Sequence, residues 1–290
     1  MKLTMHSTHL FLTLSATVFS AVPFTAQNLQ VVQADREVEA GVYGYDYEFD
    51  DGVLQSLATS GLGAWADTAV VALDDYYGVP IGTASADQVS NIEGRALSVE
   101  LTADAATAGN LFLEDAGGNS SYAVDFRVRE AVRFRASASA ELTFGYNLSG
   151  ASLRASNGPA LFSFSLIQVG SDAASTTGWL MPGDYSFDAS LEIYAGQGPG
   201  GSGETQSGNL DAGLVLYHAG DFDMDDAVRL ADRGAFLAAW SNGSPSADVD
   251  GDGDVDGSDR RAFLSAWRRG MGRALPASPA AVSGTPSGNG

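Results

Sequence analysis

Aspartate residues at alternate positions mark a short segment near the end of the chain, residues 248–259. Within these twelve residues, carboxylates occupy positions 1, 3, 5, 9 and 12, and Gly253 stands at position 6. Such spacing in a loop aims alternate side chains at one point, and glycine at the sixth position permits the sharp turn that this requires. The pattern therefore predicts a loop that closes around a centre of positive charge.

This is the oxygen-ligand spacing of an EF-hand calcium loop, because a hard cation of that size takes about six to eight oxygens. Asp259 stands where such a loop has a bidentate Glu, so the chain must approach the ion more closely. Position 7, Asp254, is expected to contribute its backbone carbonyl. The sequence thus predicts Ca²⁺ as the cofactor. The predicted ligands of this loop are Asp248, Asp250, Asp252, Asp254, Asp256 and Asp259.

The same pattern occurs 27 residues earlier in the chain (248 − 221 = 27). In each copy a Phe, an Ala and a Trp follow the loop at i, i+3 and i+4, which is one apolar face of a short helix. Neither helix is long enough to be stable alone, so we expect the two repeats to pack face to face and to bury both aromatic pairs. The ligands predicted for the first copy are Asp221, Asp223, Asp225 and Asp232. The packing residues are Phe236 and Trp240 in the first copy and Phe263 and Trp267 in the second.

Paired loops that end in Asp at position 12, each followed by a helix and not preceded by one, resemble a type I dockerin. The resemblance covers residues 219–270 and implies a small α-helical, calcium-folded module of a secreted bacterial protein. It also implies docking to a cohesin-like protein or to a cell-surface component, through loop positions 10 and 11 and along the helices. These positions are Leu230-Ala231 and Gly257-Ser258 rather than hydroxyl pairs, so the resemblance does not identify the partner.

The first loop departs from this pattern at two positions. Asp226 replaces the turn glycine, and Arg229 occupies position 9. An aspartate adopts the left-handed conformation only at a cost, and an arginine has no acceptor atom to offer to an ion. We therefore expect the first site to be weaker, or to be partly neutralised by Arg229. The competing hypothesis of a solvated acidic tail does not explain why Phe and Trp repeat in register.

The N-terminal residues 1–26 have the pattern of a secretory signal peptide. Lys2 is their only charge, an apolar run extends from Leu10 to Phe24, and Ala26 is a candidate for the last residue before cleavage. No later segment has the length and apolarity of a membrane span. We therefore expect an extracellular protein, with a disordered tail at 271–290, where Ala, Pro, Ser and Gly dominate.

The charge balance and the rare residue types exclude several functions. The formal net charge is −21, which argues against nucleic acid and anionic membranes as partners. There is no cysteine, so calcium rather than a disulfide is the expected staple of the small module. His218 is the one histidine beyond the signal peptide, so a zinc site and a Cys–His nucleophile are excluded.

Residues 30–218 are predicted to form an antiparallel β-sandwich of jelly-roll type with about eight strands. Residues 50–90 are ambiguous and are also compatible with a short helix. The glycine-rich stretch 196–208 is interpreted as a long loop within the sandwich, because residues 210–217 have the pattern of another strand; the alternative is a linker between domains. The runs of alternating apolar and polar residues lie at 42–49, 97–101, 122–128, 132–134, 142–146, 162–166, 185–193 and 214–216.

No catalytic residue stands out in the predicted sandwich. Carboxylates for glycoside hydrolysis are available, but most of them alternate with apolar residues and are expected to face solvent. These are Glu93, Glu100, Glu114, Glu130, Glu141 and Glu192. Aromatic residues in or near loops are candidates for a carbohydrate-binding face. These are Trp65, Tyr76, Tyr77 and Trp179.

The sequence therefore favours a secreted, non-catalytic calcium-binding protein whose dockerin-like module docks a partner. Two alternatives stay open: a dockerin-bearing extracellular polysaccharide hydrolase or lyase, and a carbohydrate-binding module. A polysaccharide is a candidate partner in both.

Overall fold

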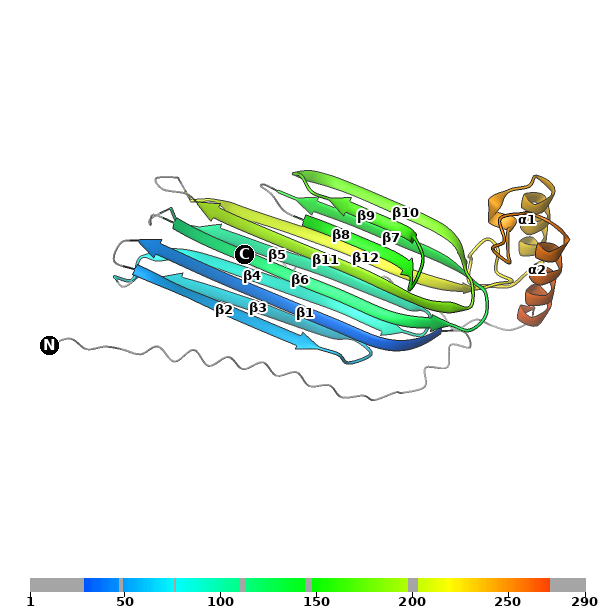
Figure 1. Ribbon diagram of the computed structural model, residues 1–290, viewed down its shortest axis with the longest axis horizontal. Helices are drawn as coiled ribbons and strands as arrows, with labels where there is room; N and C mark the ends of the chain where they lie inside the picture. The colour runs from blue at the N-terminus through cyan, green and yellow to red at the C-terminus, as the bar shows by residue number, and fades with distance from the viewer. Residues whose placement is uncertain are drawn as a thin grey trace.

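The computed structural model describes residues 29–46, 49–75, 77–109, 113–143, 148–197 and 203–271. Two antiparallel sheets pack face to face as a sandwich, and a small helical part lies at one end of it (Figure 1). The predictions for the signal peptide, for Tyr76 and for most of the tail concern residues outside the described ranges. The strands are β1 (Leu29–Asp46), β2 (Phe49–Thr59), β3 (Trp65–Asp74), β4 (Pro80–Glu93), β5 (Ala96–Thr107), β6 (Leu113–Val128), β7 (Val132–Leu142), β8 (Leu148–Ala155), β9 (Ala160–Leu166), β10 (Gly170–Leu180), β11 (Gly183–Gln197) and β12 (Thr205–His218). The helices are α1 (Leu230–Ser241), the short 3₁₀ helix η1 (Pro245–Ala247) and α2 (Gly257–Gly270).

The strand order shows how the chain builds the two layers. Sheet A has the order β2-β1-β6-β11-β8-β9, and sheet B has the order β10-β7-β12-β5-β4-β3. From β5 onward the strands pair as a nested ribbon, β5 with β12, β6 with β11, β7 with β10 and β8 with β9. Successive pairs of this ribbon alternate between the sheets, which is the organisation of a jelly roll. The hairpins β1–β2 and β3–β4 then widen sheet A and sheet B respectively.

Period-two alternation places the core between the sheets. Along β7 every second residue from Phe134 to Leu142 is buried, and the residues between them face solvent. Rings meet inside the core, where Phe126 stacks on Tyr185 with ring centroids 5.7 Å apart. At Gly118 the two sheets approach so closely that a Cβ atom would lie 2.3 Å from the carbonyl oxygen of Ser85 in the opposite sheet. Small inward residues thus decide how near the layers come.

The predicted mainly β, antiparallel sandwich is confirmed, but its strands are more numerous and longer than expected. The run 42–49 is not one strand, because β1 ends at Asp46 and pairs there with Phe49, the first residue of β2. In the sequence the alternation of aromatic residues continues from one strand into the next, so it does not show where β1 ends. A helix within 50–90 is wrong, since β2, β3 and β4 occupy this region. Strands β8 and β10 were missed because small residues dilute their alternation.

The glycine-rich stretch lies between two strands of the sandwich. Strand β11 continues to Gln197 and β12 begins at Thr205, so strand structure takes up both ends of the predicted loop. Because β12 pairs with both β5 and β7, the last strand is central in sheet B. The interpretation as a loop within the sandwich holds. No helix in the described ranges combines the length and apolarity needed to cross a membrane.

Replacement of Leu101 by alanine is expected to destabilise the sandwich by about 2–5 kcal/mol, because it removes buried methyl groups and leaves a cavity. Leu101 lies in β5 and is fully buried. The free energy of unfolding, measured by denaturant titration, checks this. Leu54→Ala is the matched control, since Leu54 is 60% exposed in β2 and its truncation should change stability by no more than about 0.5 kcal/mol. Equal losses in the two variants would contradict the assigned core.

Candidate metal centre

The helical part is built from two copies of one unit, each a loop followed by a helix. Phe236 of α1 and Phe263 of α2 are fully buried and stack with ring centroids 4.0 Å apart. Phe222 from the first loop meets both rings edge-on, at 5.6 Å and 5.8 Å. Three closely packed rings are a large share of the apolar area that so small a part can bury. This aromatic cluster fixes the two loops relative to each other.

The two tryptophans are only half-buried, so the prediction that both aromatic pairs would be buried is wrong for them. Each indole instead joins the two copies at their surface. Trp240 Nε1 donates to the backbone oxygen of Asp256, and Trp267 Nε1 donates to that of Arg229 at 2.6 Å. Asp256 and Arg229 are the residues that precede α2 and α1, so each indole bonds the start of the other helix. An indole that donates to a surface carbonyl must keep its edge near solvent.

The loop carboxylates at positions 1, 3 and 5 converge in both copies. In the first loop, one carboxylate oxygen from each of Asp221, Asp223 and Asp225 lies within 4.8 Å of the others. The corresponding oxygens of the second loop converge in the same way. That group consists of Asp248, Asp250 and Asp252. Oxygen-only donor sets of this kind suit a hard divalent cation.

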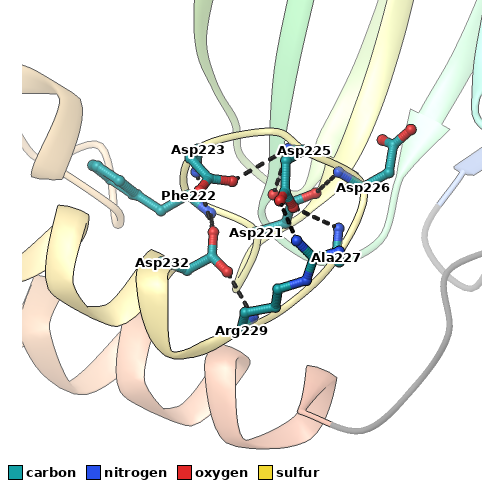
Figure 2. Close-up of polar contacts among 8 residues, drawn as sticks. All are labelled: Asp221, Phe222, Asp223, Asp225, Asp226, Ala227, Arg229 and Asp232. Carbon is teal, nitrogen blue, oxygen red and sulfur yellow. Dashed lines mark hydrogen bonds and ion pairs between the residues drawn. The ribbon is translucent and has the colours of Figure 1, made fainter.

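Backbone amides hold the position 1 carboxylates. Asp221 accepts from the amides of Asp225 at 3.1 Å and Asp226 at 3.0 Å, and Figure 2 shows the chain curling around it. Asp248 accepts from the amides of Gly251 at 2.8 Å and Gly253 at 3.1 Å. Each loop thus wraps around its own first carboxylate.

The position 12 carboxylates bond the backbone of their own loops. Asp232 accepts from the amides of Phe222 at 2.6 Å, Asp223 at 3.2 Å and Arg229 at 2.7 Å (Figure 2). Asp259 repeats these three bonds 27 residues later, and both side chains are buried. The structure therefore places both as clamps that close the loops. Their predicted role as ligands stays a prediction.

Two other predicted ligands lie outside the converging groups. Asp256 precedes α2 and accepts hydrogen bonds from the amide and the hydroxyl of Ser258, at 2.6 Å and 2.7 Å. These bonds lower the pKa of the Asp256 carboxyl and cap the helix. The Asp254 side chain is exposed, and its amide donates to Asp252 at 2.9 Å. The expectation that Asp254 offers its backbone carbonyl stays a prediction.

Crowded negative charge gives the loops a demand for a cation. Burial, together with repulsion from Asp232, raises the pKa of Asp221 to about 6, although the amides of Asp225 and Asp226 oppose this rise. Desolvation within the loop and repulsion from Asp259 also raise the pKa of Asp250. Both shifts reflect a carboxylate that is held close to another carboxylate and is less hydrated than a free one. A divalent cation at the converging oxygens would supply compensating charge.

The two departures of the first loop are visible in its geometry, while the weaker ion binding expected of this loop stays a prediction. Arg229 forms an ion pair with Asp225, Nη1 to Oδ2 at 2.8 Å, so it neutralises one of the converging carboxylates. Asp226 adopts a left-handed conformation with φ of 71°, like Gly253 at the equivalent position. Met224 does the same with φ of 58°. The second loop has a glycine at both of these strained positions, and the first loop has one at neither.

The helical part is fixed to the end of the sandwich. The Arg133 guanidinium of β7 lies over the rings of Trp179 and Phe222, at 5.1 Å and 4.8 Å from their centroids. Arg133 Nη1 and Trp179 Nε1 both donate to the backbone oxygen of Ser246, at 3.3 Å and 3.0 Å. The sequence reading missed this junction, because it joins residues more than 60 positions apart. An arginine between apolar residues at the start of a strand was its one signal.

The structure shows which of the aromatic residues and glutamates predicted for sugar binding or hydrolysis are accessible in the sandwich. Trp179 packs against the helical part, and Trp65 is half-buried against the core, so neither is an open platform for a sugar. Tyr77 is 79% exposed. Glu114 is fully buried and accepts from the amide of Gly109 at 2.5 Å, so the expectation that it faces solvent is wrong. The other candidate glutamates are exposed or half-buried, as predicted.

Two tyrosines on the outer face of sheet A form a surface that the sequence reading did not identify. Tyr43 of β1 lies opposite Asp115 of β6, which lies opposite Gly196 of β11. The Tyr194 ring covers Gly196 so closely that a Cβ atom there would lie 2.5 Å from the ring, and its hydroxyl donates to Asp115. Both rings are partly exposed, at 37% for Tyr43 and 46% for Tyr194. Tyr43, Asp115 and Tyr194, called here the tyrosine row, thus place one ring on either side of a carboxylate.

No family model matches the chain, and no curated protein matches it. Among solved structures, the enzymatically active domain of tailspike protein 4 from bacteriophage CBA120 is similar at 12% identity with a TM-score of 0.23, covering 52% of this chain and 19% of that one. TmCBM61, solved with β-1,4-galactotriose, is similar at 12% identity with a TM-score of 0.19, covering 52% and 87% respectively. The infectious bursal disease virus Gx strain structure is similar at 8% identity with a TM-score of 0.22, covering 67% and 58%. At these scores the likenesses carry no argument about function.

Replacement of Met224 by glycine is expected to stabilise the helical part by up to about 1 kcal/mol, because glycine relieves a left-handed residue. Asp226→Gly relieves similar strain, but it removes an ion pair to Arg95 and should give no gain. Thermal unfolding of the two variants, followed by the helical circular dichroism signal, measures both effects. A loss of stability in Met224→Gly would contradict the assigned strain.

Proposed function

We propose that residues 219–270 form a dockerin-like calcium-binding module on an exported protein. The observation that carries this proposal is the twofold repetition of one loop geometry: three converging carboxylates, a first carboxylate wrapped by amides, and a position 12 carboxylate bonded to three more amides. A solvated acidic tail has no reason to repeat such bonds at equivalent positions.

The second loop fits the ion best. Asp248, Asp250 and Asp252 would hold it, and glycine occupies both left-handed positions of this loop. A bound divalent cation supplies charge that offsets the mutual repulsion of these carboxylates. Ion binding would therefore favour the closed loop and, through the aromatic cluster, the packing of the two helices. In this way the free energy of binding becomes free energy of folding.

The resemblance supports a docking role for the folded module. Leu230 at position 10 of the first loop is 68% exposed, although it begins α1 and is apolar. Gly257, at the same position of the second loop, is exposed as well. The sandwich contacts the module elsewhere, through Asp226 and Ser246, and leaves both positions open. A cohesin-like protein or a cell-surface component is the partner class that the resemblance implies.

Calcium is expected to stabilise the module against heat and to raise its helical signal. At a calcium concentration 100 times Kd, the stabilisation is about 2.7 kcal/mol. Circular dichroism and calorimetry of the chelator-treated full chain, before and after addition of calcium chloride, measure this. The variant with both Asp248→Ala and Asp252→Ala should not respond, and magnesium chloride at equal ionic strength controls for general screening. Unchanged unfolding at millimolar calcium would contradict the proposal.

A second candidate function is the binding of a neutral polysaccharide on the outer face of sheet A. The row of Tyr43, Asp115 and Tyr194 favours it, because flat rings stack on sugar rings and a carboxylate accepts hydrogen bonds from hydroxyl groups. The net charge of −21 disfavours acidic glycans.

The double variant Tyr43→Ala and Tyr194→Ala is expected to lose affinity for insoluble neutral polysaccharides by at least about fivefold, since each of the two lost stacking contacts is worth about 0.5–1.5 kcal/mol. Pull-down against a panel that includes β-1,4-galactan measures it, and Tyr77→Ala is the control at another exposed tyrosine. Failure of the unaltered chain to bind any member of the panel would exclude this candidate. Release of reducing ends from the same panel would instead favour the hydrolase alternative.

A further inference from the structure

Arginines form ion pairs with two acids of the first loop, whereas among the described residues none pairs with an acid of the second loop. There, hydrogen bonds from Ser258 and, more weakly, the charge of Arg261 lower the pKa of Asp256, but Arg261 forms no ion pair with it. Among the described residues, the ion pairs to loop acids are those of Arg95 with Asp226 and Arg229 with Asp225, and both acids belong to the first loop. Two of the three arginines near this loop, Arg95 and Arg133, come from the sandwich. The loops thus share one backbone plan and differ in the charge brought to them.

Arg95 reaches the first loop from the turn between β4 and β5. Its Nη2 atom lies 2.5 Å from Asp226 Oδ1, and its guanidinium lies over the ring of Tyr217, 5.2 Å from the centroid. The side chain is only 11% exposed, so the ion pair is partly shielded from water. Asp226 occupies the position where the second loop has Gly253. Asp226 therefore has two roles: its left-handed backbone strains the loop, and its carboxylate binds Arg95 of the sandwich.

Arg133 brings a second positive charge beneath the first loop. It is 4% exposed and lies over the ring of Phe222, the residue that follows Asp221. Burial lowers the pKa of Arg133 to about 10, and the Asp221 carboxylate opposes this fall, so the guanidinium stays charged at neutral pH. Its Nε atom is buried and has no hydrogen-bond partner in the described structure. A buried cation is expected only where negative charge compensates it.

Position 9 completes the contrast. In the second loop, Asp256 adds a carboxylate there, whereas Arg229 of the first loop bonds Asp225. The first loop has five acids, at 221, 223, 225, 226 and 232, and three arginines close to it. The second has six, at 248, 250, 252, 254, 256 and 259. Among the described residues, its converging carboxylates accept hydrogen bonds from backbone amides and form no ion pair, which leaves a bound cation as the candidate source of positive charge.

We propose that the sandwich supplies to the first loop the positive charge that the second loop takes from an ion, so that the chain binds one calcium ion tightly, at the second loop. The first loop and the sandwich then form one unit that keeps its fold without metal. This inference rests on the proposed calcium function. It differs from the dockerin pattern, in which both loops hold an ion.

Isothermal titration of the chelator-treated full chain with calcium chloride tests the stoichiometry. We expect one ion per chain with a Kd of about 10⁻⁴ M or tighter. The first loop should bind calcium at least about a hundredfold more weakly than the second, with about tenfold from each of the arginines that pair with its acids, Arg95 and Arg229. Asp248→Ala with Asp252→Ala should abolish the tight ion, and Asp221→Ala with Asp223→Ala should leave it. Two ions of equal affinity would overturn the inference and leave the calcium function standing, whereas no ion at all would refute both.

A gain of binding is the complementary test. Arg95→Ala combined with Arg229→Asp gives the first loop the position 9 acid of the second and frees Asp226. We expect a second tight calcium ion in this variant, together with a lower melting temperature in chelator. Arg127→Ala is the matched control, because Arg127 pairs with Asp184 on the sandwich and contacts no loop acid. If the altered chain folds and still binds one ion, the arginines do not replace the metal and the inference fails.

Discussion

Compensation of crowded carboxylate charge is the constraint on which the C-terminal part of this chain depends. Each loop holds carboxylates within a few ångströms of one another, and desolvation together with repulsion from a neighbouring carboxylate raises the pKa of Asp221 in the first loop and of Asp250 in the second. Amide hydrogen bonds meet part of this demand in both loops, through the carboxylates at positions 1 and 12. We propose that arginines supply the remaining positive charge of the first loop and that an ion supplies that of the second. Such a difference would account for the different residues that the two loops have at positions 6 and 9.

The sequence was most informative where short-range spacing controls structure. Convergence of Asp248, Asp250 and Asp252 follows from alternate positions around one turn, and it could be predicted without tertiary information. The stacking of Phe236 on Phe263 likewise followed from helical periodicity in two equivalent segments. For Asp232 and Asp259 the sequence could not predict the partner of the side chain. A carboxylate at position 12 can bind either backbone amides or an ion, and residue spacing is the same in both cases.

The sandwich was predicted in class and underestimated in extent. Strands such as β7 can be recognised in the sequence because apolar and polar residues alternate strictly. Strand β10 consists mainly of Gly, Ser, Ala and Thr, which fit either face of a sheet, so its alternation is weak. Where the alternation runs on from one strand into the next, as from β1 into β2, the sequence pattern does not reveal the boundary between them. The junction between Arg133 and Ser246 depends on a contact between distant segments and was not predictable from either one.

The length of the strands also places the two candidate binding surfaces, the module and the pair Tyr43 and Tyr194, far apart on the molecule. The module lies at one end of the sandwich (Figure 1) and contacts it through Trp179, close to the end of β10, which is Leu180. Tyr194 instead lies eleven residues beyond Gly183, the first residue of β11 (194 − 183 = 11). Eleven residues of extended strand span roughly 35 Å, so these surfaces face different surroundings. Because Arg95 and Arg133 bond the module to the sandwich, a partner proposed to bind at α1 would also constrain the direction in which Tyr43 and Tyr194 point. If a flexible linker joined the module to the sandwich, the two surfaces could reorient independently. In this chain an ion pair and ring contacts join the two parts instead.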